Sequence, residues 1–250
     1  MIMMEKEDIK EFFKLELAGK KIEVECRNRR VFNECRGYLG CFDAPDFVIA
    51  ATNEDIDYER ELFNADQRKK KKHQIASLPD ECLEITAVYR LIAEKLLDDG
   101  ILLFHGAAIA VDGKCYLFMA DSGVGKTTHI KNWLKCIPGS FVVNGDKPLI
   151  DMLSLQVYGT PWCGKERLGT NTHVRLAGLV LLERGEKNTI EPISFRDALP
   201  GIIQQCHIPA GAEITAYSRM GLLKDVPCYR LKCNMEPESA MVSYRAIHRI

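Results

Sequence analysis

The sequence predicts an α/β protein with α+β character, in which a mixed sheet with flanking helices follows a small N-terminal α+β region. Short apolar runs, alternating in polarity or bounded by glycine turns, recur between residues 13 and 182 and predict strands. Apolar residues spaced three or four apart predict helices among them. With 46% hydrophobic residues, the 250-residue chain can build one large core and a smaller one.

The first 78 residues are expected to form the small α+β region. Two runs of alternating polarity flank Gly19, which predicts a β-hairpin. A short apolar run and a capping residue predict a strand and a helix after it. The expected elements are a hairpin over 13–26, a strand over 46–50 and a helix from Thr52 or Asn53 to Leu62.

A basic stretch without periodicity follows over residues 64–74, including Arg68 and Lys69 to Lys72. It is either a patch for an acidic partner or a solvated linker. The near-neutral charge of the chain favours the linker. We therefore expect a boundary here, between an N-terminal region (1–78) and a larger domain (79–250).

Strands and helices mix in the second region, as in α/β or α+β proteins. A periodic apolar stripe that ends at Gly100 predicts a helix over 79–99. The Asp112-Gly113 pair between apolar runs predicts a hairpin. Further strands are expected at 102–104, 107–111, 115–119, 141–143, 155–158 and 175–182, and further helices at 127–136, 194–206 and 237–247.

Charge and hydropathy exclude several classes of partner. The 34 basic and 35 acidic residues nearly cancel, which predicts no binding to nucleic acid or to an anionic membrane. No apolar run approaches the ~18 residues of a membrane span. The acidic start lacks an apolar signal segment, and ten cysteines without a C-x-x-C pair suggest free thiols. We expect a cytoplasmic protein. The sequence is compatible with an oligomer.

Residues 120–127, ADSGVGKT, differ from the phosphate-binding pattern G-x-x-x-x-G-K-[ST] only at Ala120. A predicted strand precedes them and a predicted helix follows, as a phosphate loop requires. Alanine keeps the backbone N–H donor at its position, so we expect ATP or GTP to bind here with Mg²⁺. Lys126 would reach the β- and γ-phosphates and the Thr127 hydroxyl would bind the metal. The expected nucleotide ligands are Ser122, Gly123, Val124, Gly125, Lys126, Thr127 and Thr128.

Asp146 follows the apolar run 141–143, about twenty residues after the loop. An aspartate at the end of such a strand can hold magnesium opposite Thr127. The alternative is a surface turn, because Asn-Gly-Asp is common in turns. The position relative to the loop favours the metal role.

The run FHGAAIAVDGKCYLFMADSGVGKTT, with VNGDKPLI and YGTPWCGKE after it, resembles the kinase core of the HPr kinase/phosphorylase family. Phosphoenolpyruvate carboxykinases have a similar nucleotide fold. The resemblance covers roughly residues 100–200 and is greatest to uncharacterised HPr-kinase-like proteins. It implies that residues 79–250 form a P-loop, kinase-like nucleotide-binding domain with a core of the HPr-kinase/carboxykinase type. It also implies a phosphate contact for Lys126, magnesium ligands at Thr127 and Asp146, and a role for His105 near the acceptor.

The family has two adjacent aspartates after the strand, and the first resembles a catalytic base. Gly145 occupies that position here. The resemblance implies that Gly145→Asp would raise turnover. His105 and His129 are alternative bases, although each is also a candidate for a structural histidine.

The Gly- and Pro-rich segment GTPWCGKE offers Trp162, Lys165 and Glu166, which the resemblance places near the phosphates. The other interpretation is an ordinary surface loop with a packed tryptophan. Arg167 and Arg175 are candidates to neutralise transition-state charge. The residues expected to be catalytic are Lys126, His105, Asp146 and Glu166.

The sequence therefore predicts a magnesium-dependent phosphotransferase that moves the γ-phosphoryl group of ATP to a hydroxyl of a protein, peptide or small molecule. The alternative is a regulatory module that binds nucleotide without transfer, which Gly145 favours. A carboxykinase acting on a small acid would need a further cluster of basic and metal-binding residues, which the sequence does not contain.

Overall fold

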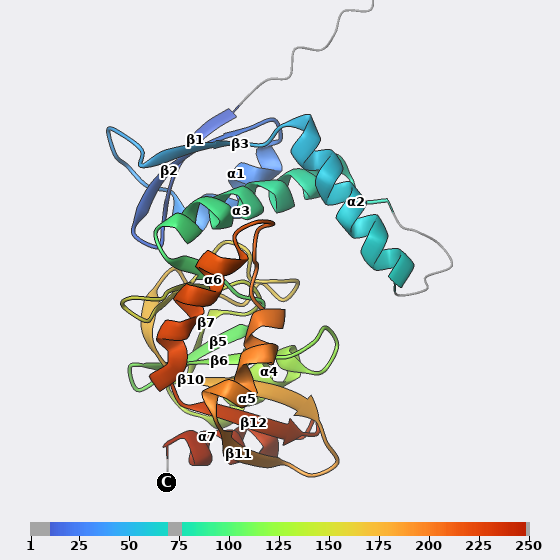
Figure 1. The fold of residues 1–250 in the computed structure, drawn as a ribbon, viewed down its shortest axis with the longest axis vertical. Coiled ribbons are helices and arrows are strands. Elements are labelled where there is room, and N and C mark those ends of the chain that lie inside the picture. The colour runs from blue at the N-terminus through green and yellow to red at the C-terminus, as the bar shows by residue number, and fades with distance from the viewer. Residues whose placement is uncertain (1–10, 70–76, 249–250) are drawn as a thin grey trace, which may run out of the picture. The chain divides into compact units, whose positions relative to one another are not determined.

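The computed structural model describes residues 11–69 and 77–248, and its chain divides into two compact units, Met1–Ile92 and Ala93–Ile250 (Figure 1). The division falls within helix α3 (Asp80–Asp98), whereas the sequence places the boundary between residues 78 and 79. The coarse fold class predicted from the sequence is confirmed, because the protein is mixed α/β with a nine-stranded mixed sheet and flanking helices.

The first unit contains a three-stranded sheet in the order β1-β2-β3. The predicted hairpin is confirmed, since β1 and β2 pair antiparallel around the turn at Gly19, where φ is +76°. The strand predicted at 46–50 pairs parallel to β2. The elements of this unit are β1 (Glu11–Leu17), β2 (Lys20–Cys26), α1 (Arg29–Cys35), η1 (Arg36–Tyr38), β3 (Phe47–Ala50), α2 (Asn53–Lys69) and the first part of α3.

Helix α2 is longer than the sequence predicts, because it continues from Leu62 to Lys69. The first part of the basic stretch is therefore helical rather than a linker, as suits the strong helix formers Gln67, Arg68 and Lys69. Residues 70–74 of that stretch lie outside the described residues. Helix α1, which Asn28 caps by accepting a hydrogen bond from the N–H of Arg30, was not predicted.

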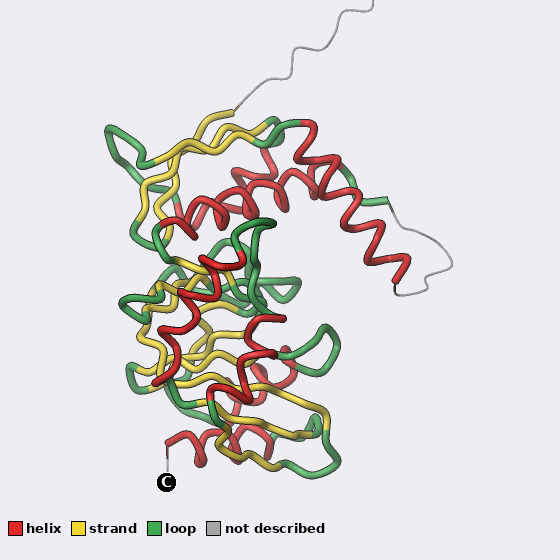
Figure 2. The backbone as a smooth tube through the Cα atoms, viewed as in Figure 1, coloured by secondary structure: helices red, strands yellow, loops and turns green. Residues whose placement is uncertain are grey.

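The second unit is built on the nine-stranded sheet (Figures 1 and 2). Its central strands β6, β10 and β12 run parallel, and the other strands pair antiparallel. The path is β4-β8-β9-β10-β6-β5-β7, with β12 beside β10 and β11 beside β12. The strands are β4 (Ile101–Leu103), β5 (Ala107–Val111), β6 (Lys114–Met119), β7 (Phe141–Asn144), β8 (Leu149–Asp151), β9 (Gln156–Tyr158), β10 (His173–Arg184), β11 (Thr189–Ile193) and β12 (Cys228–Cys233).

Helices cover both faces of this sheet, which is why β5 and β6 are apolar along nearly their whole length. Tyr116 and Phe118 of β6 pack with helices α4 (Lys126–Cys136) and α7 (Glu238–His248). Leu117 and Met119 point to the opposite face and pack with α5 (Phe195–Gln204), α6 (Glu213–Met220) and η2 (Gly221–Asp225). Strand β6 thus delivers the segment 120–125 between two buried layers.

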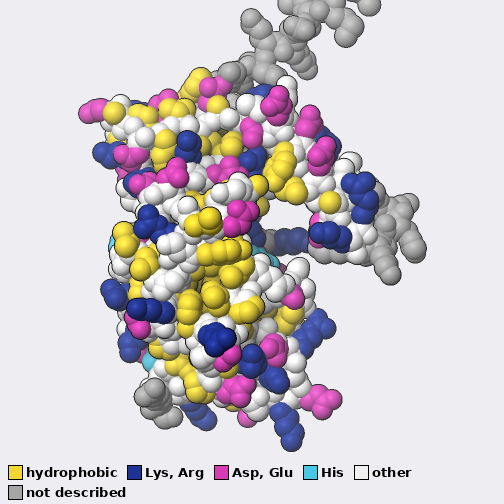
Figure 3. All heavy atoms as spheres, viewed as in Figure 1, with side chains coloured by type: hydrophobic (Ala, Val, Ile, Leu, Met, Phe, Trp, Pro, Cys, Tyr) yellow, Lys and Arg dark blue, Asp and Glu magenta, His cyan; other side chains and the backbone are white. Residues whose placement is uncertain are grey.

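Elements β8, β11, β12 and α6 were not predicted from the sequence. Strand β11 contains Pro192, which cannot donate to a ladder. It is tolerated because, among the strands that the structure describes, β11 pairs with β12 alone and so has a free edge. Exposed apolar side chains, among them Ile214, Tyr217 and Leu222, contribute to the apolar surface of the second unit (Figure 3). Within the described ranges, no helix combines the length and apolarity needed to span a bilayer.

Candidate functional site

The segment between β6 and α4 has the geometry of an anion-binding loop. Gly123 and Gly125 have φ values of +83° and +132°, which L side chains rarely adopt, so glycine is required at both positions. No side chain caps α4, and its first turn contains no acidic residue. The first N–H groups of this helix are therefore available to a phosphate, which the positive end of the helix dipole favours.

Ala120 fits the position at which the phosphate-binding pattern has glycine. Its backbone lies outside the left-handed region, and its side chain is buried in the core cluster that contains Phe118 and Ile130. Its carbonyl oxygen accepts a hydrogen bond from Nζ of Lys126 at 2.5 Å. Burial lowers the pKa of the Lys126 ammonium, and the nearby carboxylate of Asp146 opposes that shift. The lysine is thus held inside the loop it belongs to.

Two further groups fix the loop from outside. Arg184, at the end of β10, donates hydrogen bonds from Nη2 to the carbonyl of Gly123 at 2.5 Å and from Nε to that of Val124 at 3.4 Å. Asp121 Oδ1 accepts from the side-chain amides of Gln204 at 2.9 Å and Gln205 at 3.2 Å. The backbone of the loop is therefore anchored to strand β10 and to the end of helix α5.

Asp146 lies in a turn that the buried Asn144 organises. Oδ1 of Asn144 accepts hydrogen bonds from the N–H groups of Asp146 at 2.8 Å and Lys147 at 2.7 Å. Its amide donates to the carbonyl and hydroxyl oxygens of Thr160. The turn of the second interpretation is therefore present, and Asp146 lines the same pocket as residues 122–128, while its metal role stays a prediction.

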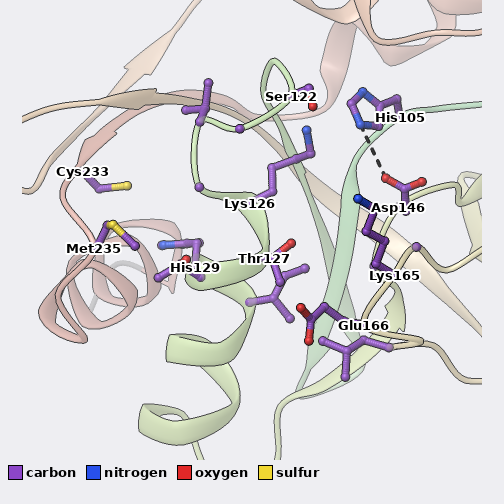
Figure 4. Close-up of a pocket in the computed structure, with 18 of the residues that line it drawn as sticks. His105, Ser122, Lys126, Thr127, His129, Asp146, Lys165, Glu166, Cys233 and Met235 are labelled. Carbon is purple, nitrogen blue, oxygen red and sulfur yellow. Dashed lines mark ion pairs between the residues drawn. The ribbon is translucent and has the colours of Figure 1, made fainter. Parts of the chain in front are cut away.

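His105 lies against Asp146, with 3.5 Å between Nε2 and the carboxylate Oδ1 (Figure 4). The backbone holds the two together, because Gly106 N–H donates to the carbonyl of Asp146 at 2.9 Å. The other carboxylate oxygen, Oδ2, forms an ion pair with Lys147 Nζ at 3.1 Å. Burial, aided by the charges of Lys147 and Lys126, lowers the pKa of His105 to about 4, so its ring is neutral at pH 7.

His105, Asp146 and residues 122–128 line one pocket of about 790 Å³ in the second unit. Its charged lining includes Lys126, Lys165 and Arg184 as cations and Asp146 and Glu166 as anions. Figure 4 shows the side chains of Lys126 and Lys165 extending toward the space beside Asp146, with Thr127 at the start of the helix below them. All ten expected site residues, from the loop and from positions 105, 146 and 166, lie in the lining of this pocket.

Gly145 has no room for a side chain. A Cβ atom there would lie 2.9 Å from the carbonyl oxygen of Leu168 and 3.1 Å from that of Cys163. Its N–H also donates to the Leu168 carbonyl at 2.8 Å. Gly164 approaches from the same loop, and a Cβ atom on it would lie 3.0 Å from Cβ of Asp146. Gly145→Asp is therefore no simple restoration of a carboxylate, because the backbone of 163–168 must move first.

The loop GTPWCGKE contributes in a different way from the one expected of Glu166. The carboxylate of Glu166 pairs with Lys131 Nζ at 2.9 Å, and both side chains are about half exposed. Glu166 therefore lies at the rim with a cationic partner, a poor arrangement for a base. Trp162 is buried, as the interpretation with a packed tryptophan expects. Lys165, by contrast, reaches into the pocket.

His129 has a structural role. It is only 2% exposed, and its Nε2 lies 3.1 Å from Trp133 Nε1 and 3.2 Å from Ser243 Oγ. Its Nδ1 lies 3.4 Å from Ser239 Oγ. Burial lowers the pKa of His129 to about 4. With both ring nitrogens used between α4 and α7, His129 is excluded as the base.

Thr127 and Asp146 suit a magnesium ion that a nucleotide brings with it. Hydroxyl and carboxylate oxygens are the hard ligands magnesium prefers, and it often takes only one or two from the protein beside phosphate oxygens. Among the described residues, no group of three or more His, Cys, Asp or Glu side chains could hold a metal ion. The residues thus fit a metal–nucleotide complex rather than a metal centre of the protein alone.

Sequence reasoning missed Arg184 and Gln205, which contact the loop from 60 or more positions away. Neither residue belongs to a recognisable sequence motif, so their contacts with the loop are seen only in the folded structure. Arg167 and Arg175, the two arginines considered from the sequence, do not line the pocket. Arg175 donates instead to the carbonyl of Ser154 at 3.4 Å.

Comparison with models of known protein families gives no match for this chain. Comparison with curated proteins also gives none.

Proposed function

We propose that the second unit is a magnesium-dependent ATP- or GTP-binding domain of the HPr-kinase type, and that it transfers the γ-phosphoryl group to a hydroxyl of a protein, peptide or small molecule. One observation carries the proposal: the loop with the uncapped helix α4 and Lys126 faces His105 and Asp146 across a single pocket. Phosphoryl transfer needs this combination of a phosphate cradle, a cation and a proton acceptor.

The triphosphate binds with its charge on the N–H groups of the loop and at the start of α4. Lys126 leaves the carbonyl of Ala120 and contacts the terminal phosphates. Lys165 adds a second cation from the opposite wall. Thr127 and Asp146 hold magnesium, which supplies charge neutralisation to the phosphates when it is bound.

His105 serves as the proton acceptor in this scheme. The acceptor oxygen bonds to the γ-phosphorus, the bond from that phosphorus to the bridging oxygen breaks, and the diphosphate leaves. The hydroxyl proton passes to Nε2 of His105, the ring nitrogen on the side of Asp146. A pKa of about 4 makes the free histidine a weak base. The negative charge of a bound triphosphate raises that pKa again.

Binding is tested by thermal unfolding and calorimetry with Mg-ATP and Mg-GTP. A ligand at 100 times its Kd stabilises the native state by about 2.7 kcal/mol. The expected result is a rise in melting temperature with one or both nucleotides, lost in Lys126→Ala and kept in Lys131→Ala, whose half-exposed ammonium pairs with Glu166 at the rim. No shift at millimolar nucleotide together with no heat of binding overturns the proposal.

Transfer is tested with γ-labelled nucleotide, by following label that leaves the nucleotide for an acceptor. A nucleotide-binding module without transfer is the second candidate, because Gly145 leaves no space for a second carboxylate. Tight binding in which the label stays on the nucleotide assigns that function instead. Transfer that falls about 10²-fold or more in His105→Gln supports the kinase.

A further inference from the structure

Gln205 connects the phosphate loop to His105. It follows helix α5 directly, and its carbonyl oxygen accepts a hydrogen bond from the N–H of His105 at 2.7 Å. The next residues extend this backbone pairing. Cys206 and Phe104 form an isolated antiparallel β-bridge, and His207 N–H donates to the carbonyl of Leu103 at 2.8 Å. The backbone of Gln205 is thus fixed beside the histidine.

The side-chain amide of Gln205 contacts two partners, one through its nitrogen and one through its oxygen. Its Nε2 lies 3.2 Å from Oδ1 of Asp121 in the loop, and its Oε1 lies 2.8 Å from Nδ1 of His105. A carboxylate only accepts hydrogen bonds, so the amide must turn its NH₂ group toward Asp121. The carbonyl end then faces the ring, and only an N–H at Nδ1 satisfies it. Gln205 is only 7% exposed, so water has little access to either contact.

We propose that Gln205 is a positioning residue that holds the neutral ring of His105 in the Nδ1–H tautomer, with its own amide oriented by Asp121 of the phosphate loop. The lone pair of His105 then lies on Nε2, the nitrogen 3.5 Å from Asp146, where a hydroxyl proton is to be accepted. The catalytic meaning of this arrangement rests on the proposed function. The tautomer itself does not.

The other tautomer is disfavoured at Nδ1, where it would place a lone pair against the carbonyl oxygen of Gln205 at 2.8 Å. In exchange it would gain only an Nε2–H that faces Oδ1 of Asp146 at 3.5 Å, the long limit of a hydrogen bond. With a hydrogen on Nε2, that nitrogen could accept no proton. In serine proteases, a change that leaves geometry intact but favours the wrong histidine tautomer lowers kcat by about 10⁴. The orientation of one amide therefore decides whether His105 can act as a base.

Gln204 provides a matched control. Its Nε2 donates to the same oxygen of Asp121 at 2.9 Å, and it has no hydrogen bond to His105. Gln204→Met therefore removes one contact of the loop, whereas Gln205→Met removes the same kind of contact together with the ring's partner. Methionine keeps the length of the side chain in both variants. Asp121→Asn is a second test variant. An asparagine amide can both donate and accept hydrogen bonds, so it no longer fixes which end of the Gln205 amide faces it.

The test is the ¹⁵N spectrum of the histidine rings in the full chain at pH 7.5, with the His105 signals identified by their loss in His105→Gln. The wild type is expected to show a protonated Nδ1 and an unprotonated Nε2. Gln205→Met, and Asp121→Asn if the first variant does not fold, should shift the population toward Nε2–H. Gln204→Met should leave it unchanged. A wild-type ring protonated at Nε2, or a tautomer unaffected by both variants, overturns the proposal.

A kinetic measurement separates this inference from the proposed function. If the wild type transfers phosphate, Gln205→Met should lower kcat by about tenfold or more with little change in KM for nucleotide. Gln204→Met, which removes a contact of the loop but not the partner of the ring, should lower kcat by clearly less. Equal kcat in the wild type and Gln205→Met overturns the positioning role. If the wild type shows no transfer, the proposed function fails and the ring spectrum alone decides the tautomer.

Discussion

Lys126 donates a hydrogen bond to the carbonyl oxygen of Ala120, the residue that begins its own loop. Only 9% of Lys126 is exposed. A phosphate that binds the loop must therefore compete with this carbonyl for the ammonium group. The free energy gained is the difference between two charge-assisted hydrogen bonds rather than the full value of one.

Lys126→Ala is expected to weaken triphosphate binding by less than the ~1.5–3 kcal/mol of a full hydrogen bond to a charged group, because the ammonium gives up its bond to the Ala120 carbonyl. Diphosphate binding should fall less, because the ammonium is expected to reach the γ-phosphate. Calorimetry with both nucleotides measures the difference. Lys131→Ala on the same helix is the control. Equal losses for the two nucleotides would mean that the ammonium does not leave the Ala120 carbonyl for the γ-phosphate.

Ala120→Gly should lower the free energy of unfolding by roughly 1 kcal/mol, because it removes a buried methyl group and adds backbone freedom to the unfolded chain. Nucleotide affinity should stay within about twofold, since the N–H and carbonyl groups remain. Denaturant unfolding and calorimetry check the two parts. A tenfold gain in affinity would identify alanine as a defect of the loop.

Gly145→Ala should destabilise the protein by about 1–3 kcal/mol, the usual cost of overpacking, because its Cβ would meet the carbonyl oxygens of Leu168 and Cys163. Gly221→Ala is the control in the same unit, with open space around its Cβ position and a helical φ of −57°. Denaturant unfolding compares the two. Gly145→Asp should cost more than Gly145→Ala, and equal stability of wild type and Gly145→Ala would contradict this packing.

Acid should destabilise the protein through His129. Its pKa is about 4 in the folded protein against 6.5 for an unperturbed histidine, so the unfolded chain binds more protons between these values. Stability is therefore lost as the pH falls from about 6.5 toward 4, by at most about 3 kcal/mol for this residue. His105 titrates in the same window.

The measurement is the free energy of unfolding against pH in the wild type, His129→Gln and His105→Gln. Each variant should flatten part of the slope between pH 6.5 and 4. His173→Gln, which changes an exposed histidine, is the control. An unchanged slope in His129→Gln would show that the ring is not held neutral.

The sequence predicts the order of strand, glycine-containing loop and helix because its determinants are local, whereas phosphate binding by this loop stays a prediction. A strand, two glycines in a left-handed conformation and a helix start all lie within Lys114–Cys136. The turn at Asp146 was also located, because it ends an apolar strand. These elements need no distant partner to be recognised, and the order of strand, loop and helix carries most of the signal.

The rest of the site depends on distant contacts that no local pattern encodes. Arg184 reaches the loop from the far end of β10, and Gln205 bonds to Asp121 from 84 positions away. The sequence predicts a catalytic role for Glu166 from its position in a Gly- and Pro-rich loop. Its ion pair with Lys131 of α4 could not be predicted, because it depends on how that loop packs against the helix. Burial likewise decided that His129 is structural, which its sequence neighbours do not show.

The close packing around Gly145 limits how this site can evolve. The Cβ positions of Gly145 and Gly164 lie within 3.1 Å of the opposite segment, and that of Gly169 lies 3.0 Å from Cβ of Cys163. A larger residue at any one of them displaces the loop that carries Lys165 into the pocket. Substitutions here should consequently arise in compensating pairs. In an alignment of homologues, positions 145, 163–164 and 168–169 should covary more strongly than exposed positions of the same loop.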